Sequence, residues 1–185
     1  LGGTKMFEKL EFTSKVFIFV FAVSFSLFSI DWLMSLDAHW YSTIYVVKKF
    51  IMAFFHGVAM LTAIAIILNK LGYLPMLTKK HLHDFSRYIW ALSLIWGYMW
   101  LSQYLLIWYA NIPEETVYYI PREMGEYKGL FYTELIMNWA FPFFFLMWNR
   151  IAKSANWLLF AVGVLIIGQW VELYMSIMPN TVESH

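Results

Sequence analysis

The segment VFIFVFAVSFSLFSIDWLM, residues Val16 to Met34, decides the fold class of this chain. Asp31 is its only ionisable residue, and about 20 helical residues are enough to cross the hydrocarbon core of a bilayer. Four further apolar runs follow, at 50–68, 88–109, 130–148 and 157–178. Backbone groups cannot stay unpaired in lipid, and the runs do not alternate polar with apolar residues, so each predicts a helix. We therefore predict an all-α, polytopic membrane bundle with five transmembrane helices.

The overall composition supports this class and excludes others. Of the 185 residues, 61% are hydrophobic and 14% are charged, which is far from the usage of soluble domains. A net charge of +1 does not favour a nucleic-acid partner. The chain has no cysteine, which excludes thiolate-held iron–sulfur clusters, Cys-based zinc sites and covalently attached haem.

Histidines do not indicate a metal centre either. His56 is the only histidine inside a predicted span, whereas a b-type haem needs two histidines on facing helices. His81 and His83 are two residues apart and do not share a helical face. We predict no metal site and no catalytic residue in this chain.

The five runs have short connections, so residues 1–185 form a single transmembrane domain. Because the chain starts at Leu1 and not at Met, we expect it to be an interior part of a longer protein. Lysines and arginines are unevenly divided between the two sides, nine against four. The excess predicts that the N-terminal side faces the cytoplasm and that the acidic loop 110–129 lies outside. Lys48 and Lys49 fall on the outer side, where we expect them to reach lipid headgroups or to distort the start of the helix.

Polar side chains inside the spans are candidates for function, because each ionisable one costs about 2.5 to 3.5 kcal/mol on insertion scales. They are Asp31, His56, Glu134 and Glu172, with the neutral Gln103 and Asn138. The four ionisable residues and Gln103 lie on the outer side of their span centres, which favours a proton route near that surface. We interpret the three carboxylates as proton carriers. Hydrogen bonding between helices is the favoured interpretation of His56, Gln103 and Asn138.

Two stretches of sequence carry a family resemblance. SIDWLMSLDAHWYST, residues 29–43, and SQYLLIWYANIPEET, residues 102–116, resemble the NrfD-like (polysulfide-reductase type) membrane subunits of bacterial alternative complex III. The chain is more similar to the second of the two such subunits. The resemblance implies a subunit of about ten helices in the bacterial inner membrane, within a quinol:electron-acceptor oxidoreductase. In this family, the iron–sulfur clusters and haems sit on partner subunits, namely an iron–sulfur subunit and cytochrome c subunits, beside an NrfD-like paralogue.

The resemblance also extends the set of candidate site residues. It places Asp37 and His39 beside Asp31 in the first stretch. In the second stretch it places Gln103, Asn111, Glu114 and Glu115. The predicted proton pathway comprises Asp31, Glu134, Glu172, Asp37, His39 and His56. The predicted quinone or polar lining comprises Gln103, Asn111 and Asn138.

Two other classes of function stay open. A secondary transporter would show an internal repeat and polar groups near the membrane midplane. A purely structural anchor would dock extrinsic redox subunits through its acidic outer loop.

Overall fold

The computed structural model describes residues 2–37 and 40–181, and every regular element in these ranges is helical. The elements, in order, are α1 (Gly2–Phe28), η1 (Ser29–Leu33), η2 (Met34–Leu36), α2 (Thr43–Lys70), α3 (Lys79–Ala110), α4 (Pro113–Thr116), α5 (Ile120–Met124), α6 (Lys128–Leu135), η3 (Ile136–Ala140), α7 (Phe141–Leu146), α8 (Asn149–Ala152) and α9 (Ala155–Thr181). The prediction of an all-α chain is therefore confirmed for the described residues.

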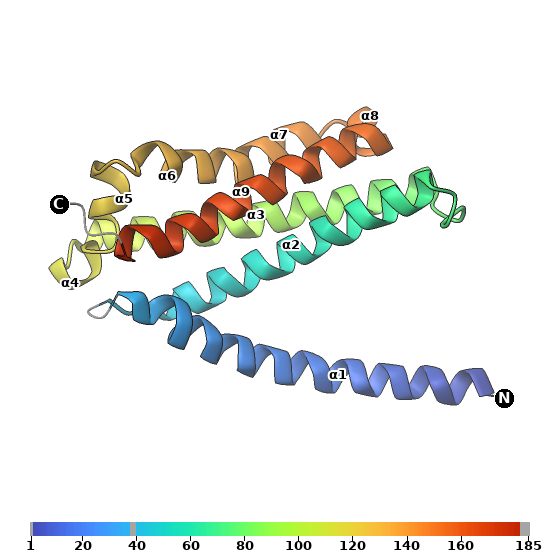
Figure 1. Ribbon diagram of the computed structural model, residues 1–185, viewed down its shortest axis with the longest axis horizontal. Helices are drawn as coiled ribbons and strands as arrows, with labels where there is room; N and C mark the ends of the chain where they lie inside the picture. Colours follow the sequence, from blue (N-terminus) through green and yellow to red (C-terminus); the bar gives the residue numbers. More distant parts are fainter. Residues whose placement is uncertain (1, 38–39, 182–185) are drawn as a thin grey trace.

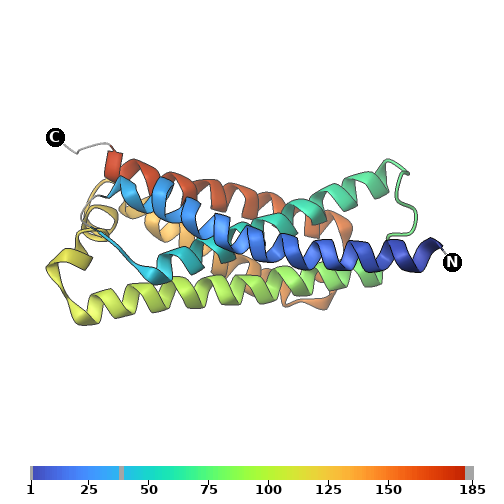
Figure 2. The same cartoon turned by 90° about the horizontal axis from the view of Figure 1, so that it is seen from below.

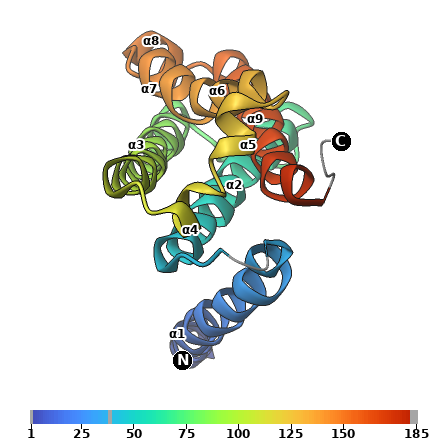
Figure 3. The same ribbon diagram turned by 90° about the vertical axis from the view of Figure 1, so that its left-hand side faces the viewer.

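The long helices run back and forth along one axis (Figure 1). The start of α1, the 71–78 turn and α8 lie at one end, and α4, α5 and the end of α9 lie at the other. Figure 2 shows the same two ends from below. Seen along the axis, α2, α3, α9 and the α6–α7 segment form a bundle, and α1 lies beside it (Figure 3). The alternation of ends agrees with the order of helices that the sequence predicts.

The predicted number of membrane spans is wrong. Within residues 2–37 and 40–181, four segments are long and apolar enough to cross a membrane: Gly3–Leu36, Thr43–Lys70, Lys128–Leu146 and Ala155–Pro179. The 88–109 run does form a helix, as part of α3, but it does not meet this criterion. The physical reason is its composition, because half-polar Trp and Tyr side chains replace aliphatic ones throughout the run. They are Tyr88, Trp90, Trp96, Tyr98, Trp100, Tyr104, Trp108 and Tyr109.

Small residues set how closely the bundle helices approach. A Cβ atom added to Gly97 of α3 would lie 2.2 Å from the indole ring of Trp139. On α9, a Cβ added to Gly168 would lie 2.7 Å from Oδ1 of Asn138. Both glycines thus leave room for η3 to pack between α3 and α9, which is the usual role of small residues in membrane helix contacts.

The α6–α7 segment changes its helical winding just before Pro142. Pro142 has no amide hydrogen to donate to the carbonyl of Asn138, four residues earlier. In the structure, residues Ile136–Ala140 form a π-helix immediately before α7. Asn138 is fully buried there, and its Nδ2 donates to the carbonyl of Gly168 at 3.1 Å. The π-helix before Pro142 is therefore also the point where this segment forms a hydrogen bond to α9.

Candidate functional site: a buried charge cluster

Four charged side chains meet inside the bundle. Lys48 and Lys49 of α2 face Glu134 of α6 and Glu172 of α9, and each of the four is at most 6% exposed. Nζ of Lys48 lies 3.5 Å from Oε1 of Glu134 and 3.9 Å from Oε1 of Glu172. Nζ of Lys49 lies 3.3 Å from the same Glu172 oxygen. We call these four residues the charge cluster; it has two positive and two negative groups.

Neutral side chains complete the environment of Glu172 and Lys49. The indole Nε1 of Trp96 in α3 donates to the second oxygen of Glu172 at 2.7 Å. Lys49 donates to Oγ of Ser176 at 2.5 Å, and that hydroxyl donates to the carbonyl of Glu172 at 2.7 Å. The ammonium of Lys49 also lies 5.2 Å from the ring centre of Tyr45, within cation–π range. Partners from three helices therefore offset the cost of burying these charges.

Arg122 of α5 connects the cluster to the end of the bundle. Its guanidinium is 2% exposed and lies 3.5 Å above the ring of Tyr118, while Nε donates to the carbonyl of Met175 at 3.0 Å. Arg122, Tyr119, Lys48 and Glu134 line a cavity of about 10 Å³, roughly the size of one water molecule. The cavity thus joins the charge cluster to α5.

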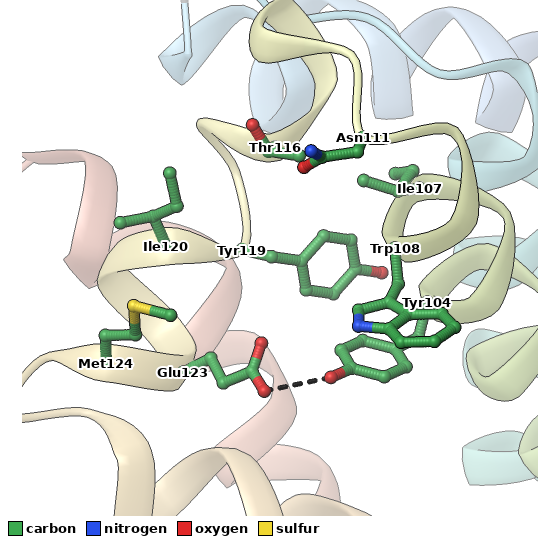
Figure 4. Close-up of a pocket in the computed structure, with 9 residues that line it drawn as sticks. All are labelled: Tyr104, Ile107, Trp108, Asn111, Thr116, Tyr119, Ile120, Glu123 and Met124. Carbon is green, nitrogen blue, oxygen red and sulfur yellow. Dashed lines mark hydrogen bonds between the residues drawn. The ribbon is translucent and has the colours of Figure 1, made fainter.

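A larger pocket opens on the other side of Tyr119 (Figure 4). Its volume is about 490 Å³, and α3, α4, α5 and their connections line it. The hydroxyl of Tyr104 donates to Oε1 of Glu123 at 2.9 Å within it. We call it the terminal pocket. Burial raises the pKa of Tyr119 well above its usual value of 10.0, so this phenol stays protonated between the terminal pocket and the cavity.

The structure brings together two of the predicted proton carriers, Glu134 and Glu172, through Lys48. It places Asp31 elsewhere, exposed on η1 beside the bundle. Asp37 is half-buried in the turn after η2, and His39 lies outside the described residues. His56 is half-buried on α2, seven residues beyond Lys49, which is about 10 Å along the helix.

The three residues predicted as a quinone or polar lining lie at three different places. Asn111 lines the terminal pocket. Asn138 is buried between η3 and α9, as a residue that joins helices would be. Gln103 is 1% exposed, lines a hollow of about 320 Å³ beside the start of α2, and has no hydrogen-bond partner among the described residues.

Sequence reasoning missed the positive half of the site. We expected Lys48 and Lys49 to reach lipid headgroups or to distort the start of the helix. Instead, they are buried among the carboxylates. Their position gave an indication. Both lysines directly precede the apolar run 50–68, and carboxylates without a basic partner were already predicted in three other spans. Arg122 was counted only as a loop charge, although it is buried as well.

Comparison with known proteins adds no further assignment: no protein-family model matches the chain, and no curated protein matches it significantly.

Proposed function

We propose that this chain is a membrane subunit of a quinol:electron-acceptor oxidoreductase of the alternative complex III type, and that its charge cluster carries protons. The proposal combines the resemblance of residues 29–43 and 102–116 with one observation. Two carboxylates and two ammonium groups are buried inside a bundle of apolar helices and are linked by three ion pairs of 3.3 to 3.9 Å. Buried ionisable groups in membrane segments are costly, and they commonly mark ion or proton pathways.

In this proposal a proton moves through a chain of contacts that the four residues already make. Lys48 stands between Glu134 and Glu172, so protonation of one carboxylate frees the lysine to pair with the other. A water molecule in the 10 Å³ cavity would extend the chain towards Tyr119, which borders the terminal pocket. The cluster thereby gains a short connection to the end of the bundle that carries α4 and α5.

We further propose that Gln103 marks a quinone-binding surface. Its buried amide has an unsatisfied donor and an unsatisfied acceptor, which a quinone carbonyl or quinol hydroxyl would complement. The hollow that it lines adjoins an apolar one of about 700 Å³, since Ile44 and Leu106 border both. An isoprenoid tail would fit the apolar hollow.

The distribution of charge supports the proposed orientation in a bacterial inner membrane. The basic residues assigned to the cytoplasmic side are all exposed in the structure: Lys5, Lys9, Lys15, Lys70, Lys79, Lys80, Arg87, Arg150 and Lys153. Of the four assigned to the outer side, Lys48, Lys49 and Arg122 are buried and only Lys128 is exposed. We propose that the acidic 110–129 segment faces the periplasm and meets the redox subunits there.

The first experiment isolates the native assembly through a tag on this chain. We expect iron–sulfur and cytochrome c subunits, with an NrfD-like paralogue, to co-purify in fixed ratio. The isolated chain without haem or iron–sulfur partners would contradict the proposal and favour a transporter.

The second experiment replaces Glu134 by Gln in the assembly and measures protons moved per electron during quinol oxidation in proteoliposomes. We expect a lower ratio with a folded complex, because the amide cannot accept a proton. Exposed Glu114 provides the matched control, Glu114→Gln, which should behave as wild type. Unchanged stoichiometry in E134Q would contradict the relay.

One observation favours a structural role instead. The cluster is balanced in charge, as a purely structural ion-pair network would be. The double variant K48M/E134L separates the two roles, because it removes one charge of each sign and leaves Lys49 paired with Glu172. A structural network would tolerate this change with full activity, whereas a relay would lose proton movement.

A further inference from the structure

The terminal pocket combines aromatic rings with a carboxylate, and this combination has no role in the proposed proton route or quinone surface. Three aromatic side chains, Tyr104, Trp108 and Tyr119, lie on one side of it, and the carboxylate of Glu123 lies next to them (Figure 4). Tyr104 fixes one oxygen of that carboxylate by its hydrogen bond, while the other points away from this bond. Aromatic faces combined with a carboxylate are the groups that bind organic cations.

The net charge around the pocket is negative. No Lys, Arg or His is among the described residues that line it. The surrounding segment, residues 110–129, holds four glutamates against Arg122 and Lys128, which gives a net charge of −2. Arg122 points away from the pocket, since its guanidinium is buried over Tyr118 and bonded to the carbonyl of Met175. An anion such as a phosphate would therefore meet no cationic partner in the pocket, whereas a cation would meet Glu123.

The apolar part of the lining favours an organic cation over a metal ion. Ile107, Ile120 and Met124 line the pocket together with the aromatic rings. A bare metal ion would need more oxygen ligands, and the described residues contain no group of three or more acidic or histidine side chains that could hold one. The volume of about 490 Å³ is also far larger than an inorganic ion requires.

We propose that the terminal pocket binds an alkylammonium group, held by Glu123 and by the faces of Tyr104, Trp108 and Tyr119. The ligand is either the headgroup of an aminophospholipid, since the pocket lies at the end of apolar helices, or a free amine. None of the four cluster residues lines the pocket, and Tyr119 is the residue that the proposed proton route and the pocket share.

The test is native mass spectrometry of the full-length protein in detergent. The protein is titrated with phosphatidylethanolamine and with phosphatidylglycerol of the same acyl chains. We expect phosphatidylethanolamine to bind at least about tenfold more tightly, a ratio that corresponds to about 1.4 kcal/mol. Competition by tetramethylammonium identifies the source: displacement of the lipid assigns the site to amines in general, and no displacement assigns it to the lipid headgroup.

Two variants make the test specific. Glu123→Gln should abolish the preference for phosphatidylethanolamine, because the amide keeps the shape of the side chain without its charge. Glu126→Gln is the matched control, since Glu126 is an exposed glutamate three residues away that does not line the pocket. Equal binding of both lipids to the wild type would overturn the proposal, as would an unchanged preference in E123Q. Glu123-dependent binding of a neutral hydroquinone, with no preference for ammonium lipids, would overturn it too.

Discussion

Helices α1 and α9 are both long and apolar, yet only α9 belongs to the bundle. In the most apolar 18 residues of each helix, half of those in α9 are buried (50%), against 11% in the N-terminal segment Gly3–Leu36. Figure 3 shows the consequence, with α9 packed between α2 and α6 and α1 set apart from them. Apolarity alone therefore does not decide which helices pack together.

The difference lies in the polar residues and in what they contact. On α9, the polar stripe of Gln169, Glu172 and Ser176 is buried, and Glu172 contacts α2 and α3. On α1, Ser24 and Ser26 donate to carbonyls of their own helix, at Val20 and Ala22. Lipid is as apolar as a leucine side chain, so a membrane helix gains little free energy when it replaces contacts with lipid by contacts with apolar side chains. Polar contacts and close packing then select the helices that associate.

The variant with the largest expected effect on stability removes the charge on α9. Replacing Glu172 by Leu leaves Lys49 buried without a carboxylate and deprives Trp96 of its acceptor. We expect a loss of about 3 to 5 kcal/mol in the free energy of unfolding, measured by denaturant titration of the purified protein in detergent. Exposed Glu114 of α4 should tolerate the same change; equal losses at Glu172 and Glu114 would contradict the assignment.

A second test changes packing without changing charge. Gly168→Ala should cost about 1 to 3 kcal/mol, because its Cβ would lie 2.7 Å from Oδ1 of Asn138. The same substitution at Gly163, on the same helix but with nothing within 4 Å, should leave stability unchanged or raise it by up to about 1 kcal/mol. Thermal unfolding of both variants compares them directly, and a Gly168→Ala variant as stable as Gly163→Ala would refute the close contact with η3.

A third test compares two serines. Ser176→Ala removes the hydroxyl that accepts from Lys49, and we expect a loss of about 1.5 to 3 kcal/mol, as for hydrogen bonds to charged groups. Ser24→Ala on α1 removes only a bond to its own helix and should change stability by less than about 0.5 kcal/mol. The same unfolding measurement applies, and similar values for the two variants would show that the polar stripe of α9 does not stabilise the bundle.

Much of the fold was predictable from local sequence: four of the five apolar runs lie within helical segments, and the fourth extends past the end of α7 by Met147 and Trp148 alone. The position of the break before Pro142 was predictable for the same reason. The count of spans was not, since it depends on how strongly Trp and Tyr in α3 lower its affinity for lipid. At the site, Glu134 and Glu172 could be selected by the cost of burying a carboxylate. Their pairing with Lys48 and Lys49 could not, because it depends on the rotation of α2 relative to α6 and α9, which only tertiary packing sets.

The central claim is that the charge cluster moves protons, and it is tested most directly by the proton-to-electron ratio of the K48M/E134L assembly in proteoliposomes. This variant keeps the cluster neutral and retains the Lys49–Glu172 pair, so the account predicts normal assembly, retained electron transfer and fewer protons moved per electron. An assembled complex that oxidises quinol with the wild-type ratio would contradict the account.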